Sequence, residues 1–159
     1  MPTALLDTTL LSNFAHIQRP DLLRIVLGED AATVPAVIAE LEAGETLGLV
    51  PVCDWSWLTI LEPTNEEQKL AAELQQKLDA GEAECLAVAQ TREFRFFSDD
   101  FAARRLARHR DLVVSGSIGV LLTLVDGRHL SLEEADHLLT GMIDRGYRSP
   151  VKSLRELLP

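Results

Sequence analysis

The sequence predicts an α/β fold of three α/β/α layers around a central, mostly parallel twisted sheet. Short apolar runs, as in buried strands, alternate with longer segments whose leucines, valines and alanines recur at helical spacing. Several of these runs end in a polar residue that also starts a helix. Strands that alternate with helices form a parallel sheet with helices on both faces.

Length and composition limit the class of protein. The 159 residues, 47% of them hydrophobic, fit a single domain, and no apolar run approaches the roughly 18 residues that cross a bilayer. No basic segment precedes the first apolar stretch, which predicts no signal peptide, and the two separated cysteines, Cys53 and Cys85, indicate a reducing cytoplasm. The net charge of −10 argues against a broad basic face for nucleic acid, because phosphate contacts need Lys and Arg.

The first third of the chain contains the clearest strand-to-helix junction. Thr3–Leu6 is predicted to be a buried strand, and Asp7 separates it from a helix that runs from Thr8 to Phe14. Asp7 has two interpretations, the N-cap of this helix or a site residue at the carboxyl edge of the sheet. The sequence next predicts a helix from Pro20 to a stop at Gly28, a strand over 32–34 and a helix from Pro35 to Glu42 that closes at Gly44.

The rest of the chain continues the alternation. Two capping boxes, Thr64–Glu67 and Ser131–Glu134, open helices that are predicted to end at Gly81 and Gly146. The other predicted elements are strands near 58–61, 94–98 and 112–114 and helices over 81–89 and 101–108. Residues 115–119 turn into an apolar helix that reaches Val125, and a short tail helix starts at about 150.

Acidic residues recur at the predicted junctions. Asp7, Glu82 and the pair Asp99 and Asp100 lie where helices begin, and Glu40 lies beside the apolar stripe of its helix. Junctions at the carboxyl ends of parallel strands share one edge of the sheet, where converging carboxylates repel one another. A divalent cation relieves such repulsion, and oxygen ligands suit Mg²⁺ or Mn²⁺. The alternative for Glu82 and its neighbour Glu84 is compensation of the helix dipole.

Taken in order, these segments resemble the PIN-domain nucleases, and in particular their toxin-type branch. The resemblance covers essentially the whole chain and implies a three-layer α/β/α fold, an acidic cluster that binds Mg²⁺ or Mn²⁺, and endoribonuclease activity. A toxin of this branch would have a small antitoxin partner and form a homodimer. The matching segments are Leu6–Thr8, Val34–Leu41, Gly81–Ala89 and Ser98–Asp100, with Gly116–Leu122 as a further element of the toxin-type branch.

The resemblance also implies which acids are catalytic metal ligands. Asp7 and Glu40 match the first two acids of the family, and Glu82 matches the third, where Asp is more usual and Glu84 is an alternative. Asp100 matches the fourth, and Asp99 competes with it because a one-residue shift of the strand end would exchange them.

RNA contacts are expected near the last acids. Ser98 would orient a carboxylate or a phosphate, or serve as a simple cap. Arg104 and Arg105 belong to a basic concentration that would guide a phosphate backbone or neutralise nearby acids. A non-enzymatic alternative is a PIN-like module that binds RNA or a protein while its acidic cluster is inert. A phosphohydrolase with Asp7 as nucleophile is disfavoured, because no second Asp follows two residues later.

Overall fold

The computed structural model describes residues 1–159, and its centre is a five-stranded sheet in which all strands are parallel. The spatial order is β3-β2-β1-β4-β5, so the winding reverses at β1, and a crevice at such a switch point is where open α/β sheets bind ligands. The strands are β1 (Ala4–Leu6), β2 (Ala31–Thr33), β3 (Thr59–Ile60), β4 (Arg95–Phe97) and β5 (Val114–Ser115).

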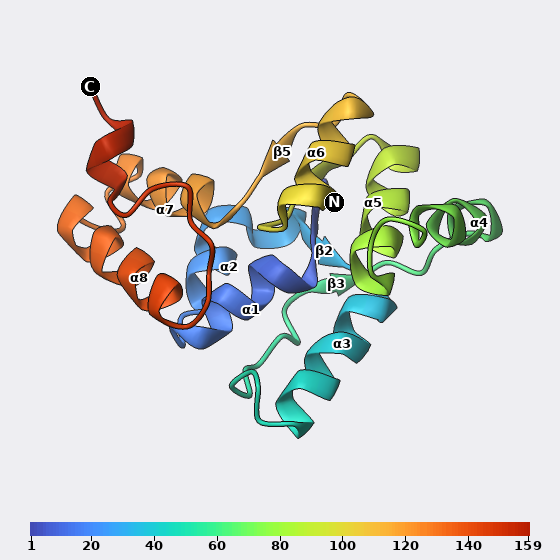
Figure 1. Ribbon diagram of the computed structural model, residues 1–159, viewed down its shortest axis with the longest axis horizontal. Coiled ribbons are helices and arrows are strands. Elements are labelled where there is room, and N and C mark those ends of the chain that lie inside the picture. Colours follow the sequence, from blue (N-terminus) through green and yellow to red (C-terminus); the bar gives the residue numbers. More distant parts are fainter.

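Helices cover both faces of this sheet, which confirms the predicted three-layer α/β/α architecture. Helices α1, α2, α7 and α8 lie on one side and α4, α5 and α6 on the other, while α3 contacts both α1 and α5 (Figure 1). None of the helices has the length and apolar character that a membrane span requires. The α-helices are α1 (Thr8–His16), α2 (Asp21–Leu27), α3 (Pro35–Thr46), α4 (Asn65–Leu74), α5 (Ala80–Arg92), α6 (Phe101–His109), α7 (Ser117–Asp126) and α8 (Leu132–Asp144).

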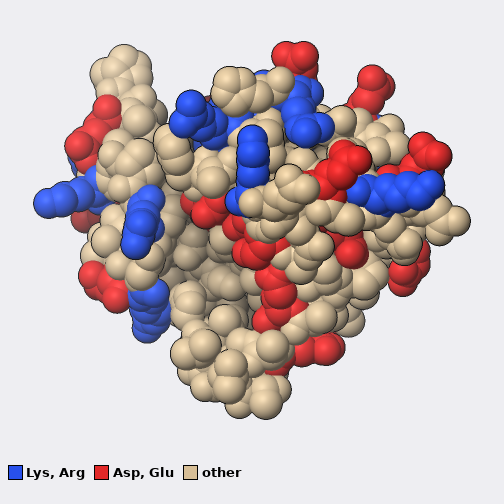
Figure 2. All heavy atoms as spheres, turned by 45° about the vertical axis from the view of Figure 1, so that its right-hand side comes forward, with Lys and Arg blue, Asp and Glu red and all other residues tan.

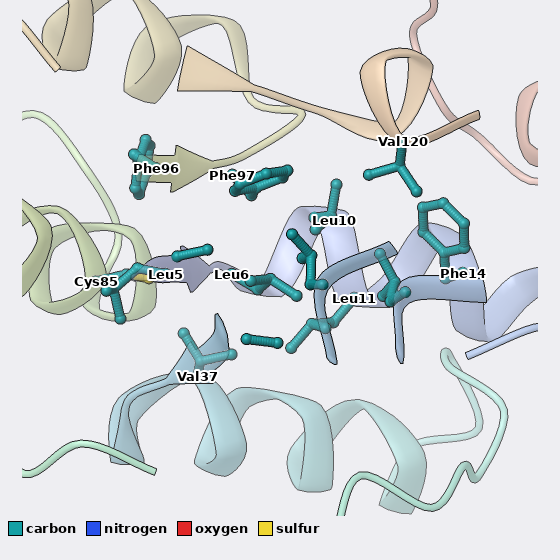
Figure 3. Close-up of a cluster of buried hydrophobic side chains, with 14 of the residues drawn as sticks. Leu5, Leu6, Leu10, Leu11, Phe14, Val37, Cys85, Phe96, Phe97 and Val120 are labelled. Carbon is teal, nitrogen blue, oxygen red and sulfur yellow. The ribbon is translucent and has the colours of Figure 1, made fainter. Parts of the chain in front are cut away.

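The hydrophobic core surrounds β1 and the first helix. Leu5 and Leu6 of β1 lie beside the rings of Phe96 and Phe97 on β4, and Phe14 of α1 extends toward α7 (Figure 3). These side chains are fully or almost fully buried, and burial of each stabilises the fold by roughly 1.5 to 3 kcal/mol. The strand before Asp7 and the helix after it are therefore both held in place by core packing.

Several helix boundaries differ from the sequence prediction. The helix that begins at Pro35 continues through Gly44 to Thr46. Helix α4 ends at Leu74 and does not extend to Gly81, which instead lies in the first turn of α5. The reason is a third capping box, in which Asp79 and Glu82 each accept a hydrogen bond from the other's backbone N–H. Gly28 does end α2, in the left-handed region with φ of +52°.

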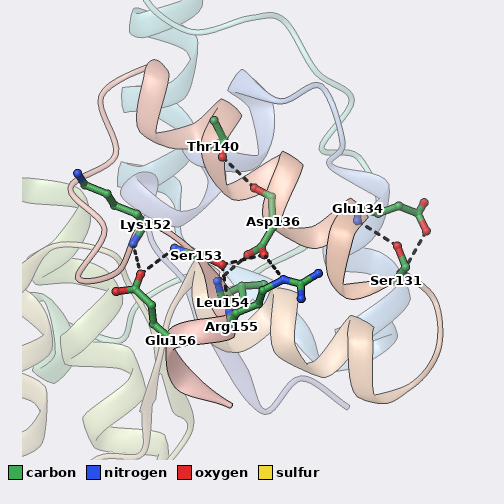
Figure 4. A network of polar contacts seen from close by, with 9 residues as sticks. All are labelled: Ser131, Glu134, Asp136, Thr140, Lys152, Ser153, Leu154, Arg155 and Glu156. Atoms are coloured by element: carbon green, nitrogen blue, oxygen red, sulfur yellow. Dashed lines mark hydrogen bonds and ion pairs between the residues drawn. The ribbon is translucent and has the colours of Figure 1, made fainter. Parts of the chain in front are cut away.

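The end of the chain is shorter in helix than expected. It forms one 3₁₀ helix, Leu154–Leu157. The other 3₁₀ helix of the chain, Gly28–Asp30, lies between α2 and β2. Asp136 of α8 accepts hydrogen bonds from the Ser153 hydroxyl at 2.8 Å and from the Leu154 N–H at 2.6 Å (Figure 4). Leu154 is fully buried. Polar and apolar contacts thus fix the tail against α8.

Candidate active site

Asp7 ends β1 and begins α1. Its Oδ1 accepts hydrogen bonds from the Leu10 N–H at 3.1 Å and the Thr9 hydroxyl at 2.7 Å, so this oxygen caps the helix. The other oxygen, Oδ2, is buried and has no hydrogen-bond partner. Burial raises the pKa of Asp7 to about 7, although the nearby Ser98 hydroxyl and the bonds from Thr9 and Leu10 oppose the shift. The structure thus confirms the capping interpretation of Asp7 through Oδ1, while Oδ2 takes no part in the cap.

Glu40 connects α3 to the starts of α1 and α5. Its Oε1 accepts the Gly81 N–H at 2.5 Å, and its Oε2 accepts the Thr8 hydroxyl at 3.2 Å. A Cβ atom on Gly81 would lie 2.1 Å from Oε1, so any larger residue there would have to displace the Glu40 carboxylate. Burial raises the pKa of Glu40, and repulsion from Asp79 adds to the shift.

Glu82 lies in the first turn of α5, and its side chain is almost fully buried. Burial raises its pKa to about 8, with further contributions from the negative charges of Asp79, Asp100 and Asp7. Glu82 follows a helix and not a strand, which corrects the predicted strand-to-helix junction. It reaches the acidic group because the N-terminus of α5 points to the same edge of the sheet.

Two acids near Glu82 have roles that the sequence did not predict. Asp79, the N-cap of α5, belongs to the acidic group, yet the sequence prediction missed it because Gly81 was assigned as a helix stop. The spacing of Asp79 and Glu82 is the signal that would have identified it. Glu84, the alternative to Glu82, accepts the Ala36 N–H at 3.2 Å and so caps the start of α3.

Asp99 and Asp100 follow β4 and have separate partners. Asp99 accepts hydrogen bonds from the Ser117 N–H at 2.7 Å, the Asn13 side chain at 2.7 Å and the Ser117 hydroxyl. These bonds join the end of β4 to the second half of α1 and to the start of α7. Burial raises the pKa of Asp99, against the effect of the same hydrogen bonds. Asp100 caps α6 through the Ala103 N–H at 2.9 Å, and its charge acts on Glu82.

The predicted RNA contacts divide into two groups. Ser98 is buried, and its hydroxyl accepts the Asp100 N–H at 3.1 Å, while its carbonyl oxygen accepts Arg104 Nη1 at 2.9 Å. Arg105, the next residue of α6, lines a different hollow together with Lys77. Arg104 therefore lies at the acidic group, and Arg105 lies outside it.

An open cavity of about 430 Å³ lies at this edge of the sheet. Glu40, Asp79, Asp99 and Asp100 line it, whereas Asp7 and Glu82 are buried behind this lining. Figure 2 shows a hollow on one face of the molecule, with acidic side chains along one wall and basic side chains above and opposite. The acids thus border a space that a ligand can enter.

The acidic group has the donor chemistry of a site for a hard divalent cation. All of its side-chain donors are carboxylate oxygens, and Asp7 Oδ2 is an unpaired one. No three Asp, Glu, His or Cys side chains are arranged to hold an ion directly. Mg²⁺ often keeps several waters and binds one or two carboxylates, so the carboxylates that line the cavity suit such an ion by their chemistry, with Asp7 buried behind them.

A family model described as a PIN domain matches residues 3–159. No curated protein and no solved structure matches the chain. The matched region includes the whole sheet and each of the acidic residues described above.

Proposed function

The chain belongs to the PIN-domain family, whose members are generally nucleases, and we propose that it is a metal-dependent endoribonuclease that hydrolyses RNA phosphodiester bonds. The observation that most supports this function is the unpaired Oδ2 of Asp7 among carboxylates whose pKa values burial raises. Buried carboxylates without cationic partners cost stability, and function is the usual reason to keep them.

In this proposal Asp7, Glu40, Glu82 and Asp100, together with Asp99, hold Mg²⁺ or Mn²⁺. The bound ion would activate water and neutralise charge on phosphoryl oxygens. Asp7 offers its free oxygen, and Glu82 gives up the proton that it holds near neutral pH. The hydrogen bonds of Asp99 and Glu40 keep their carboxylates in fixed orientations.

The RNA contacts of the proposal are Ser98, Arg104 and Arg105. Arg104 and Asp99 both lie against the backbone of Gly116. A Cβ atom added there would be 2.5 Å from Asp99 Oδ1 and 2.6 Å from Arg104 Nη1. That position supports a role for Arg104 at a phosphate near the acids. The structure gives less support to Arg105, because its side chain lines the neighbouring hollow.

We also propose the finer assignments that rest on the resemblance to the toxin-type branch. These are a toxin of a toxin–antitoxin pair, a small antitoxin partner, a homodimer and a cytoplasmic location. Residues 1–159 would form a single PIN-like domain, which agrees with one cluster of 36 buried hydrophobic residues.

One observation favours a second function. Because no three carboxylates are arranged to hold an ion directly, an inert PIN-like module that binds RNA or a protein is the alternative. It would keep the cavity and the basic side chains but would not cleave RNA.

Cleavage of a mixed RNA pool with Mn²⁺ separates these functions. Asp7→Asn is the test variant, and Asp126→Asn, an exposed aspartate at the far end of α7, is the matched control. The nuclease proposal expects cleavage by the native protein and the control but not by Asp7→Asn. Equal cleavage by all three would mean a contaminating nuclease, and no cleavage by any would favour the binding module.

A further inference from the structure

A second and larger cavity lies beside the acidic one. Its volume is about 690 Å³, which is within the range of small-molecule sites, and it lies between α6, the start of α7 and the tail. Three arginines line it, Arg104, Arg108 and Arg148, while Asp99 is the single acid of its lining. The cavity is therefore basic in a chain whose net charge is −10.

Two of these arginines have no acidic partner. The ion pairs of the structure involve Arg19, Arg92 and Arg155, and none involves Arg108 or Arg148. Both of these side chains are exposed and make no side-chain hydrogen bond. In an acidic protein, free guanidinium groups in one cavity indicate an anionic ligand.

An exposed aromatic ring lies where the two cavities meet. Phe101 is 76% exposed and is the one aromatic residue among the exposed large hydrophobic side chains. It lines both the acidic and the basic cavity, as do Asp99, Tyr147 and Arg148. A polymer in the basic cavity would therefore pass Phe101 to reach the acids.

The tail holds one wall of the basic cavity in place. Tyr147, Arg148 and Leu157 line it, and the contacts of Asp136 with Ser153 and Leu154 fix the segment that contains them (Figure 4). Figure 2 shows basic side chains above the hollow and on the side opposite the acids. The basic wall thus has a defined position relative to the acidic one.

We infer that the basic cavity binds single-stranded RNA next to the phosphate that is cleaved. One unpaired base stacks on Phe101, and the neighbouring phosphates contact Arg108 and Arg148. An aromatic ring beside free guanidinium groups is the combination that single strands use, since every base has a face to stack. An acidic peptide would use the arginines but would gain less from the ring. The inference rests on the proposed ribonuclease function in one respect, which is that the single strand is RNA.

Binding without cleavage tests the inference. Fluorescence anisotropy of a labelled eight-nucleotide RNA is measured in EDTA over a series of salt concentrations. We expect Phe101→Ala to weaken binding roughly 10-fold or more. Arg108→Gln and Arg148→Gln should each lower the slope of log K against log salt by about 0.7. The controls are Leu47→Ala, which truncates a side chain that is 72% exposed at the end of α3, and Arg128→Gln after α7; both should bind as the native protein does.

The outcomes separate this inference from the ribonuclease proposal. Unchanged affinity and salt slope in all three cavity variants would overturn the inference, even if the native protein cleaves RNA with Mn²⁺. Cavity-dependent RNA binding by a native protein that does not cleave RNA would uphold the cavity as a single-strand site and refute the ribonuclease. Equal loss in the control variants would also overturn it, since binding would not depend on the cavity. Binding of a hexaglutamate peptide but no RNA would assign the cavity to an acidic protein segment and contradict the inference.

Discussion

Helices α4 and α5 begin with the same motif but in opposite electrostatic surroundings. Each has a capping box, Thr64 with Glu67 in α4 and Asp79 with Glu82 in α5, and both glutamates are buried. Burial raises the pKa of Glu67, but hydrogen bonds from Arg92 and Thr64 outweigh it and bring the pKa below its usual value. Glu82 has no such cation, and its pKa rises to about 8.

The difference between the two boxes shows what the local motif decides and what it does not. Both boxes satisfy the first N–H groups of a helix, and that is a local property. The charge of Glu67 is balanced within the protein by Arg92, whose Nε lies 2.9 Å from Glu67 Oε1. The charged groups that act on Glu82 are all carboxylates, so we interpret α4 as structural and propose that the start of α5 belongs to a cation site.

The largest expected effect is on cleavage. Glu82→Gln should lower the Mn²⁺-dependent rate by about 10²-fold or more, because it removes a carboxylate from the proposed ion site. Glu67→Gln, which changes the same atoms in the matching box, should keep the native rate per folded molecule. Rates are measured on one RNA substrate, with circular dichroism to establish the folded fraction. If both variants lose activity equally, the comparison between the boxes fails.

The same two variants should change stability in opposite directions. Glu67→Gln should lower the free energy of unfolding by about 2 kcal/mol, because it breaks a pair that is buried on one side and partly exposed at Arg92. Glu82→Gln should raise it by about 1 to 3 kcal/mol at pH 8 without metal, because a buried and unpaired charge is removed. Urea denaturation in EDTA measures both values. A loss of stability in Glu82→Gln would refute an uncompensated charge at this residue.

The pH dependence should follow from the raised pKa values. The pKa of Asp7 is about 7 in the folded protein against an ordinary value of 3.8, and that of Glu82 is about 8 against 4.5. The folded protein then binds more protons than the unfolded chain between about pH 4 and 8, so its stability falls as pH rises through this range. Asp7→Asn should flatten the fall. Melting temperatures from pH 5 to 8 in EDTA test this, and a steeper fall in Asp7→Asn would contradict it.

A smaller effect is expected from the glycine that lets Glu40 approach α5. Gly81→Ala should destabilise the protein by about 1 kcal/mol or more, because the new Cβ would meet Glu40 Oε1 and displace the carboxylate. Gly141→Ala, in the helix α8, is the control; its nearest neighbour would be 3.3 Å away, and alanine favours helix. Thermal unfolding distinguishes the two, and equal melting temperatures would mean that Glu40 moves without cost.

The sequence predicted what local chemistry determines. Apolar runs, capping residues and the order of strands and helices led to the three-layer α/β/α fold, which the structure confirms. The assignment of Gly81 as a stop failed, because a glycine inside a helix and a glycine after one look alike until the partner is known. Here the partner is Glu40, 41 residues away. Asp79 was missed for the same reason.

The chemistry of the acids was harder to predict than their identity. The sequence suggested carboxylates at one edge, but it did not show that Asp7 Oδ1 caps α1 while Oδ2 is unpaired. Nor did it show that Asp99 is fixed by Asn13 and Ser117. These contacts join segments far apart in the chain, and so they depend on packing that no local pattern contains.

The central claim is that a divalent cation stabilises carboxylates that otherwise repel one another. Calorimetric titration of the metal-free protein with Mn²⁺ at pH 7, in two buffers of different ionisation enthalpy, tests it most directly. The account predicts saturable binding with release of protons from Asp7 and Glu82, and weaker binding with fewer protons released in Asp7→Asn. Absence of binding to the native protein, or identical binding and proton release in Asp7→Asn, would contradict it.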